Sequence, residues 1–201
     1  MRIPLFFIMF LIFLFVCNNI RRKIQQKERK SIDDFWKQET TANCTYPQDI
    51  SKLNYVDFTK VSLPFSCFDD SILHQCEQQV HSFSQQKVLN LTGISNTTLK
   101  EIYGAANLGR LSRYDENFTV LVRTLNQWGH RLNQLSCLRE AQSVLEFAVS
   151  IGSDIKPTYE LLGEIYQSQG NIDGIAMLKI TASSLNSLMK EPILKLLNET
   201  A

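Results

Sequence analysis

The sequence lacks the short motifs that tie particular residues to a known catalytic mechanism. Its 201 residues contain no glycine-rich phosphate loop, no HExxH zinc motif, no GxSxG nucleophile turn and no EF-hand calcium loop. Glu160 and Glu164 lie one helical turn apart, but an exposed helix face accounts for two such carboxylates. We therefore expect a protein that is not an enzyme, with no catalytic residues and no cofactor.

Cysteine and histidine are scarce, with five and three residues respectively. His74 and His81 lie seven positions apart, not at the i, i+4 spacing that favours metal binding on a helix. The cysteines form no CxxC pair, and four of them are widely spaced: Cys44, Cys67, Cys76 and Cys137. We expect no metal site, whereas the pairing of these cysteines in disulfides stays open.

Charge, glycine and serine are absent between Leu5 and Cys17. A fold in water would have to bury this apolar run on every side, whereas a bilayer solvates it directly. Counted from Ile3 to Ile20, a helix covers about 27 Å, close to the thickness of a hydrocarbon core. We expect a single transmembrane helix within residues 1–20 that contacts the lipid bilayer through residues 3–20.

Two other N-terminal signals agree less well with the sequence. A cleaved secretory signal ends in small residues, and the end of this run has none. A lipoprotein cleavage box would end at Cys17, but bulky Val16 stands where a small side chain is needed. Both signals stay open as alternatives to an uncleaved anchor.

Basic residues follow the apolar run directly and are opposed only by Glu28: Arg21, Arg22, Lys23, Lys27, Arg29 and Lys30. The positive-inside rule places such a cluster in the cytoplasm, where anionic headgroups attract it. From Ser31 onward, 14 Lys and Arg oppose 19 Asp and Glu, and an acidic body is a poor ligand for nucleic acid. We expect a single-pass cell-membrane protein with a cytoplasmic C-terminal domain.

Five glycosylation sequons support a different location, at Asn43, Asn90, Asn96, Asn117 and Asn198. Sequons that are used imply an exported chain. An exported or lumenal glycosylated helical protein therefore stays open as an alternative.

No stretch after the anchor alternates strongly enough to predict a strand, so the expected fold class is all-α. A basic juxtamembrane segment and extended linker is expected over residues 21–65, laid on the body by apolar side chains such as Tyr55 and Phe58. A helical domain is expected over residues 66–201. Its first helix follows a cap at Asp69 or Asp70, and its longest apolar helix face runs from Phe118 to Leu135.

Residue types in the last third recur with a period of 34. Leu125, Trp128, Gly129, Leu132, Ala141 and Ala148 return as Tyr159, Leu162, Gly163, Tyr166, Ile175 and Ala182. Period and residue types together resemble the tetratricopeptide repeat, a stack of antiparallel helical hairpins. We expect two units, about 122–155 and 156–189, in which Gly129 and Gly163 let the two helices of a hairpin approach closely, with helices on either side as caps.

In tetratricopeptide repeats, the first helix of each hairpin lines a groove for a protein or peptide. The resemblance implies that eight polar residues of this chain occupy the groove positions: Arg123, Asn126, His130, Asn133, Gln134, Glu160, Glu164 and Gln167. They depart from the Lys/Asn clamp with which chaperone-binding relatives grip a terminal carboxylate, so we do not expect that ligand.

Other segments, among them Tyr103-Gly-Ala-Ala-Asn-Leu108 and Tyr114-Asp-Glu-Asn-Phe118, resemble small single-pass membrane proteins of Gram-positive bacteria. That family has no assigned activity, so the resemblance implies a bacterial, cytoplasm-facing protein and no site residues. The function expected first is a membrane-anchored adaptor or scaffold.

One alternative is a structural subunit of a membrane complex that buries Phe35, Trp36 or the extended arm against another membrane protein. Another is a hydrolase or transferase with a site that the sequence does not reveal. Exposed apolar surface in the groove would favour peptide binding, whereas exposed apolar surface on the arm or the outer face would favour assembly.

Overall fold

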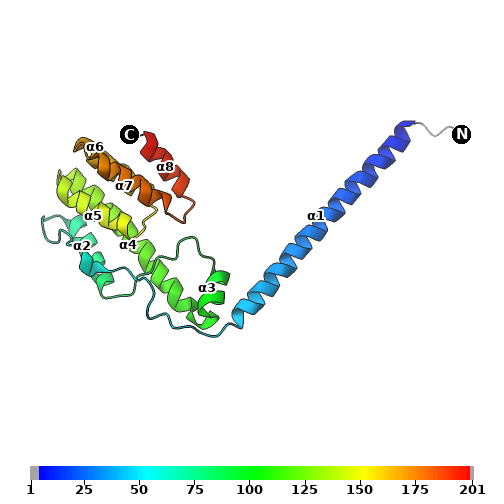
Figure 1. Ribbon diagram of the computed structural model, residues 1–201, viewed down its shortest axis with the longest axis horizontal. Coiled ribbons are helices and arrows are strands. Elements are labelled where there is room, and N and C mark those ends of the chain that lie inside the picture. The colour runs from blue at the N-terminus through cyan, green and yellow to red at the C-terminus, as the bar shows by residue number, and fades with distance from the viewer. Residues whose placement is uncertain (1–4, 200–201) are drawn as a thin grey trace. The chain divides into compact units, whose positions relative to one another are not determined.

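The computed structural model describes residues 5–199, apart from the side chains of residues 5–8 and Lys60. Over this range all regular secondary structure is helical, and loops join the helices (Figure 1). The expected all-α class is confirmed. The helices are α1 (Leu5–Asn43), α2 (Ser71–Ser84), α3 (Asn96–Tyr103), α4 (Leu108–Gln134), α5 (Leu138–Ser150), α6 (Lys156–Ser168), α7 (Ile172–Ser183) and α8 (Lys190–Glu199), with short 3-10 turns η1 (Phe58–Lys60) and η2 (Ala105–Asn107).

The chain forms two compact units, whose boundaries differ from the predicted divisions at residues 20 and 65. One unit combines residues 1–48 with 96–106, and the other combines 49–95 with 107–201. The segment 96–106 was expected to belong to the helical domain. It joins the first unit because α3 packs against the carboxyl end of α1, a contact between segments too distant in sequence for local periodicity to reveal.

The expected linker over 21–65 is wrong in its first half, because α1 continues through Asn43. Ile32, Phe35, Trp36, Glu39 and Ala42 follow one another at helical spacing. Ala42 is fully buried, and the Glu39 carboxylate forms an ion pair with Lys100 and accepts a hydrogen bond of 2.9 Å from the hydroxyl of Thr97. These contacts with α3 stabilise the last turns of α1.

Within the part of the chain that the structure describes, no helix has both the length and the apolar character of a membrane span. Residues 1–4 of the expected anchor lie outside the described residues. The transmembrane helix therefore stays a prediction from the sequence.

The second unit is a stack of helical hairpins. α4 pairs with α5 and α6 with α7, and α8 packs against both helices of the second pair. α5 and α7 begin 34 residues apart, and so do α6 and α8, so the period of the sequence recurs in the helix boundaries. α2 covers α4 at the other end of the stack. α2 and α8 thus lie where the caps were expected.

Local signals at the helix ends agree with the structure. Asp70 caps α2 by accepting from the backbone N–H groups of Ile72 and Leu73, both at 3.0 Å. α6 ends before Gly170, which has a φ of 66°, and Asn171 then caps α7. In the first hairpin the same left-handed position is taken by Ser136, with a φ of 62°.

The two repeat glycines are not equivalent. A Cβ atom on Gly129 would lie 2.5 Å from Cδ2 of Leu145, so this glycine does allow α4 and α5 to approach closely. A Cβ atom on Gly163 would meet only Cδ2 of Leu197, at an ordinary 3.6 Å. The expectation that Gly163 brings α6 and α7 together is therefore wrong, because its nearest neighbour belongs to α8.

The arm from residue 49 to 65 has no long helix and lies along the second unit, as its apolar side chains predicted. The backbone N–H of Val56 donates to the carbonyl of Val88 at 2.9 Å. Val56, Phe58, Val61 and Leu63 are partly buried against the hydrophobic core. The arm thereby covers apolar surface that the hairpins leave open.

Candidate functional site

The eight residues of the predicted groove lie on two adjacent helices. α4 carries five of them and α6 carries three, and the two helices contact each other directly. Five are exposed to solvent: Arg123, Gln134, Glu160, Glu164 and Gln167. The face is therefore polar and of mixed charge, with no exposed aromatic or large aliphatic side chain among the predicted residues.

Asn126 has a structural partner. Its Oδ1 accepts a hydrogen bond of 3.0 Å from the hydroxyl of Thr158, a residue that is fully buried. The bond joins α4 to α6 and satisfies a polar group inside the stack. Asn126 thus holds the two first helices together rather than facing a ligand freely.

His130 is half-buried, and its Nε2 is buried without a hydrogen-bond partner among the described residues. Asn133 is also half-buried. Burying a ring nitrogen without a partner costs free energy, because no hydrogen bond replaces the one that water would make. His130 accordingly contributes more to the packing of α4 than to a polar binding face.

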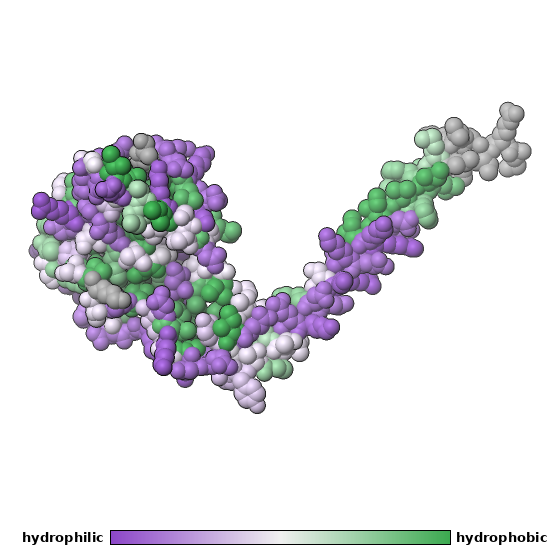
Figure 2. All heavy atoms as spheres, viewed as in Figure 1, coloured by the Kyte–Doolittle hydropathy of each residue, from purple (hydrophilic) through white to green (hydrophobic). Residues whose placement is uncertain are grey.

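The basic cluster predicted at the membrane surface lies along α1. All six basic residues between positions 21 and 30 are exposed. Figure 2 shows the hydrophilic surface of this stretch directly after the hydrophobic stretch of the same helix. The basic cluster is therefore exposed to solvent along this stretch of α1.

The outer face of α7 is a surface that the sequence reasoning missed. Met177 and Ile180 are each 62 % exposed, Ile172 is 77 % exposed, and Leu188 in the following turn is 98 % exposed. Leu178 and Ala182 on the opposite side are buried. Figure 2 shows strongly hydrophobic atoms at the surface in the region where Figure 1 places α7. α7 is thus apolar on both sides, a pattern typical of helices that are covered on both sides.

The equivalent face of the first hairpin is polar except at Leu138, the counterpart of Ile172, which is 44 % exposed. The residues 34 positions before Ala176, Met177 and Ile180 are Gln142, Ser143 and Glu146. Glu146 accepts a hydrogen bond of 2.7 Å from the hydroxyl of Tyr166, and Gln142 accepts one of 2.8 Å from the amide of Gln169. The same position in the hairpin is therefore polar on α5 and apolar on α7, so the apolar character of α7 is not a requirement of the hairpin itself.

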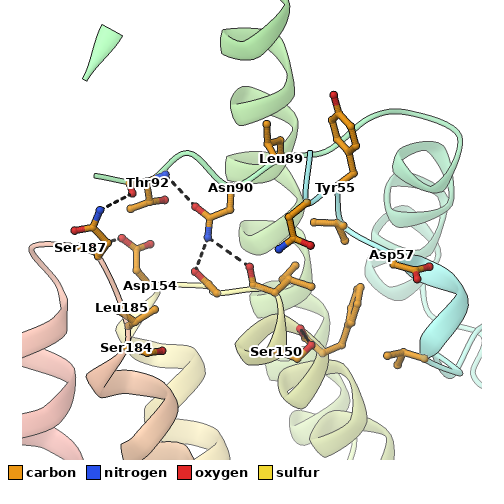
Figure 3. Close-up of a pocket in the computed structure, with 17 residues that line it drawn as sticks. Tyr55, Asp57, Leu89, Asn90, Thr92, Ser150, Asp154, Ser184, Leu185 and Ser187 are labelled. Carbon is orange, nitrogen blue, oxygen red and sulfur yellow. Dashed lines mark hydrogen bonds between the residues drawn. The ribbon is translucent and has the colours of Figure 1, made fainter. Parts of the chain in front are cut away.

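A hollow of about 700 Å³ lies where four connecting segments of the second unit meet (Figure 3). Asn90 holds it together, because its side-chain amide donates to the carbonyls of Ile151 at 3.4 Å and Gly152 at 3.2 Å. Its Oδ1 accepts from the backbone N–H of Thr92 at 3.0 Å. Asn186 in turn donates to the carbonyl of Thr92 at 3.4 Å.

The carboxylates in this hollow already have partners. Asp57 accepts from the backbone N–H and the hydroxyl of Thr59, at 2.9 and 2.7 Å, and Asp154 accepts from the hydroxyl of Ser187. The described lining residues include no histidine, cysteine, lysine or arginine. They supply amides, hydroxyls and carboxylates, several of which form hydrogen bonds between the loops.

Local sequence patterns could not locate this hollow, because its lining residues come from segments between Asn54 and Ser187. The outer face of α7 did leave a signal, since residues 172–182 are apolar on both sides of the helix. No family model, no curated protein and no solved structure matches the chain.

Proposed function

We propose that this protein is a membrane-tethered assembly module whose outer α7 face binds an apolar helix of another protein at the same membrane. The observation that carries the proposal is the exposed apolar face formed by Ile172, Met177 and Ile180. Exposed apolar surface on the outer face favours assembly, whereas the first-helix groove offers polar side chains only. The structural-subunit hypothesis thus has better support than peptide capture in the groove.

The partner is an α-helix because the exposed face has the geometry of a helix-packing surface. Ile172, Ala176 and Ile180 follow one another at i, i+4 and i+8, with Met177 beside them. Residues at this spacing form a ridge that fits between the side chains of a neighbouring helix. Asp173 and Lys179 border the face with one charge of each sign, so the surface favours a neutral apolar partner over a charged one.

The membrane tether rests on the sequence. The run from Leu5 to Cys17 supplies an apolar segment, and the cluster from Arg21 to Lys30 supplies the cytoplasmic flank. A tether supports an assembly role because it confines the module and its partner to one surface, which raises their effective concentration. The resemblances to tetratricopeptide repeats and to small single-pass bacterial proteins agree with this role.

Two sequons argue against the exported, glycosylated alternative. The side-chain nitrogen of Asn90 donates to two carbonyls, and that of Asn117 donates to the carbonyl of Lys87 at 3.1 Å. A glycan replaces one hydrogen of this amide and fills the space beside it. Glycosylation at either position would break contacts that hold loops of the second unit together.

Photocrosslinking from single positions in intact membranes tests the proposed surface. A photoreactive phenylalanine analogue replaces Met177 in one variant and Ser143, its counterpart on α5, in the matched control. We expect a discrete adduct from position 177, its loss when Ile180→Glu is added, and none from position 143. Mass spectrometry of the adduct should identify a membrane protein joined through an apolar helical segment.

Three outcomes would contradict the proposal. Adducts of equal yield from positions 143 and 177 would show random collision. An adduct from an analogue at Glu164 alone would move the interaction to the groove. An adduct between two copies of this chain would replace the separate partner with self-association.

A further inference from the structure

Two tetrapeptides of the second unit have the same form, and the serine of each has a left-handed backbone conformation. They are Phe65-Ser66-Cys67-Phe68 and Leu135-Ser136-Cys137-Leu138. Ser66 has a φ of 57° and Ser136 a φ of 62°, and among the described residues these are the only non-glycine residues with positive φ. Left-handed backbone is unfavourable for a residue with a side chain, so each turn is held by its surroundings.

The cysteine thiols have the same local partner in both turns. The Cys67 thiol donates to the carbonyl of Phe65 at 3.7 Å, and the Cys137 thiol donates to the carbonyl of Leu135 at 3.4 Å. Thiols are weak donors, so these bonds give little resistance to a change at sulfur.

Two contacts hold the first turn and the residues just after it against α4, whose carboxyl end leads into the second turn, and a third contact joins the first turn to α2. The ring of Phe65 lies 5.3 Å from that of Trp128, centroid to centroid. The backbone N–H of Ser66 donates to the Glu77 carboxylate at 3.0 Å. Asp70, three residues after Cys67, forms an ion pair of 2.6 Å with Arg131, six residues before Cys137. Although 70 positions separate the cysteines in sequence, both are thereby fixed at one end of the same hairpin.

The surroundings give the two thiols different roles. Cys67 is exposed and Cys137 is half-buried. Burial, then Glu140, then the nearby Cys67 raise the pKa of Cys137, so its thiol stays protonated more readily than an ordinary cysteine. The four side chains that flank the two Ser-Cys pairs in sequence are apolar and 43 %, 41 %, 37 % and 44 % exposed: Phe65, Phe68, Leu135 and Leu138.

We propose that Cys67 and Cys137 are a redox-active pair that forms a disulfide by exchange with a low-molecular-weight disulfide. The exposed Cys67 thiolate attacks one sulfur of the reagent. A bond forms between the Cys67 sulfur and that sulfur, while the S–S bond of the reagent breaks and its other half leaves as a thiolate. Cys137 then loses its proton and attacks Cys67 sulfur, which forms the Cys67–Cys137 bond and releases the second thiolate. The reagent is reduced to two thiols, and the protein loses two electrons and two thiol protons.

The bond would fasten the segment before α2 to the turn between α4 and α5. This end of the stack is separate from the outer face of α7, so the inference does not depend on the proposed function. In a reducing compartment, where stable disulfides are rare, such a pair would respond to oxidation and would not be a permanent crosslink.

The test uses the full chain in detergent, treated with oxidised glutathione and then with an alkylating reagent. We expect a peptide that links Cys67 to Cys137, with loss of both thiol hydrogens and no bound glutathione. Reduction should restore both thiols. The substitution Cys137→Ser should instead leave glutathione on Cys67, because the resolving thiol is gone.

Cys44→Ser and Cys76→Ser are the matched controls, and both should retain the linked peptide. Stable glutathionylation of Cys67 in the unsubstituted protein, or a link from Cys67 to Cys44 or Cys76, would overturn the proposal. The peptide map of the unsubstituted protein decides the question even if a variant fails to fold.

Discussion

Nη2 of Arg131 lies 2.6 Å from Oδ2 of Asp70, so the carboxylate that caps α2 also binds α4. The hydrogen bonds from Arg131, followed by those from the Leu73 backbone, lower the pKa of Asp70 from 3.8 to about 2. A single side chain therefore joins local helix capping to the packing of two helices.

This pKa predicts how acid affects stability. A carboxyl group with a lowered pKa stabilises the fold above its unfolded pKa, and that stabilisation is lost as pH falls through its folded pKa. For Asp70 the loss should occur between pH 3.8 and about 2. Asp70→Asn should unfold at a lower temperature than the unsubstituted protein at pH 7, and the difference should narrow towards pH 2. Thermal unfolding, monitored by circular dichroism at each pH, measures the unfolding temperature of both proteins.

Asp69→Asn is the control for this prediction, since the neighbouring Asp69 is exposed. It should change neither the unfolding temperature nor its pH dependence. If Asp69→Asn and Asp70→Asn behave alike, the contribution assigned to the Asp70–Arg131 pair is wrong.

Alanine at the two repeat glycines should have opposite effects. Gly129→Ala places a Cβ atom 2.5 Å from Cδ2 and 2.7 Å from Cγ of the fully buried Leu145. Such overpacking costs about 1–3 kcal/mol, more than the roughly 1 kcal/mol that alanine gains over glycine in a helix. Gly163→Ala makes only ordinary contact and should stabilise the fold by up to about 1 kcal/mol. Chemical denaturation of both variants gives the comparison, and equal destabilisation would contradict it.

Substitutions at His130 test whether its ring contributes to the packing of α4 or to a polar binding face. Replacing a buried nitrogen that has no partner with an apolar group removes its desolvation cost, so His130→Leu should keep or raise stability by about 1 kcal/mol. His130→Ala should lower stability, because it leaves a void. If His130→Leu instead destabilises the fold as much as His130→Ala does, the ring nitrogen has a role that the described contacts do not show.

The two sides of α7 should respond differently to charge. Met177→Glu and Ile180→Glu change exposed side chains, so the free energy of unfolding should shift by no more than about 0.5 kcal/mol. Leu178→Glu buries a charge in the core and should prevent folding. Chemical denaturation measures the free energy of unfolding of each variant, and co-purification from membranes measures whether each variant still binds its partner. Loss of folding in Ile180→Glu would show that this face is already covered inside the chain.

Helical periodicity and end signals predicted most of the second unit. The cap at Asp70, the turn at Gly170 and the long apolar face from Phe118 agree with the structure. These features depend on residues a few positions apart, which a sequence displays directly. The period of 34 likewise indicated where successive helices begin.

The errors concern contacts between distant residues. The end of α1 depends on Lys100 and Thr97, which pair with Glu39 from about 60 positions away. The eight residues of the predicted groove lie on α4 and α6, but the sequence could not show that Asn126 accepts a hydrogen bond from Thr158. The exposed outer face of α7 likewise depends on tertiary structure, because an apolar residue at helical spacing is buried only where another helix covers it.

The insertion of α3 into the first unit also sets how force passes through the chain. The polypeptide crosses between the two units near residues 48, 95 and 106, so three covalent strands share a pull applied to α1. A protease cut in the arm after Gln48 would sever one of them, and the packing of α1 against α3 would then hold α1 without a covalent bond.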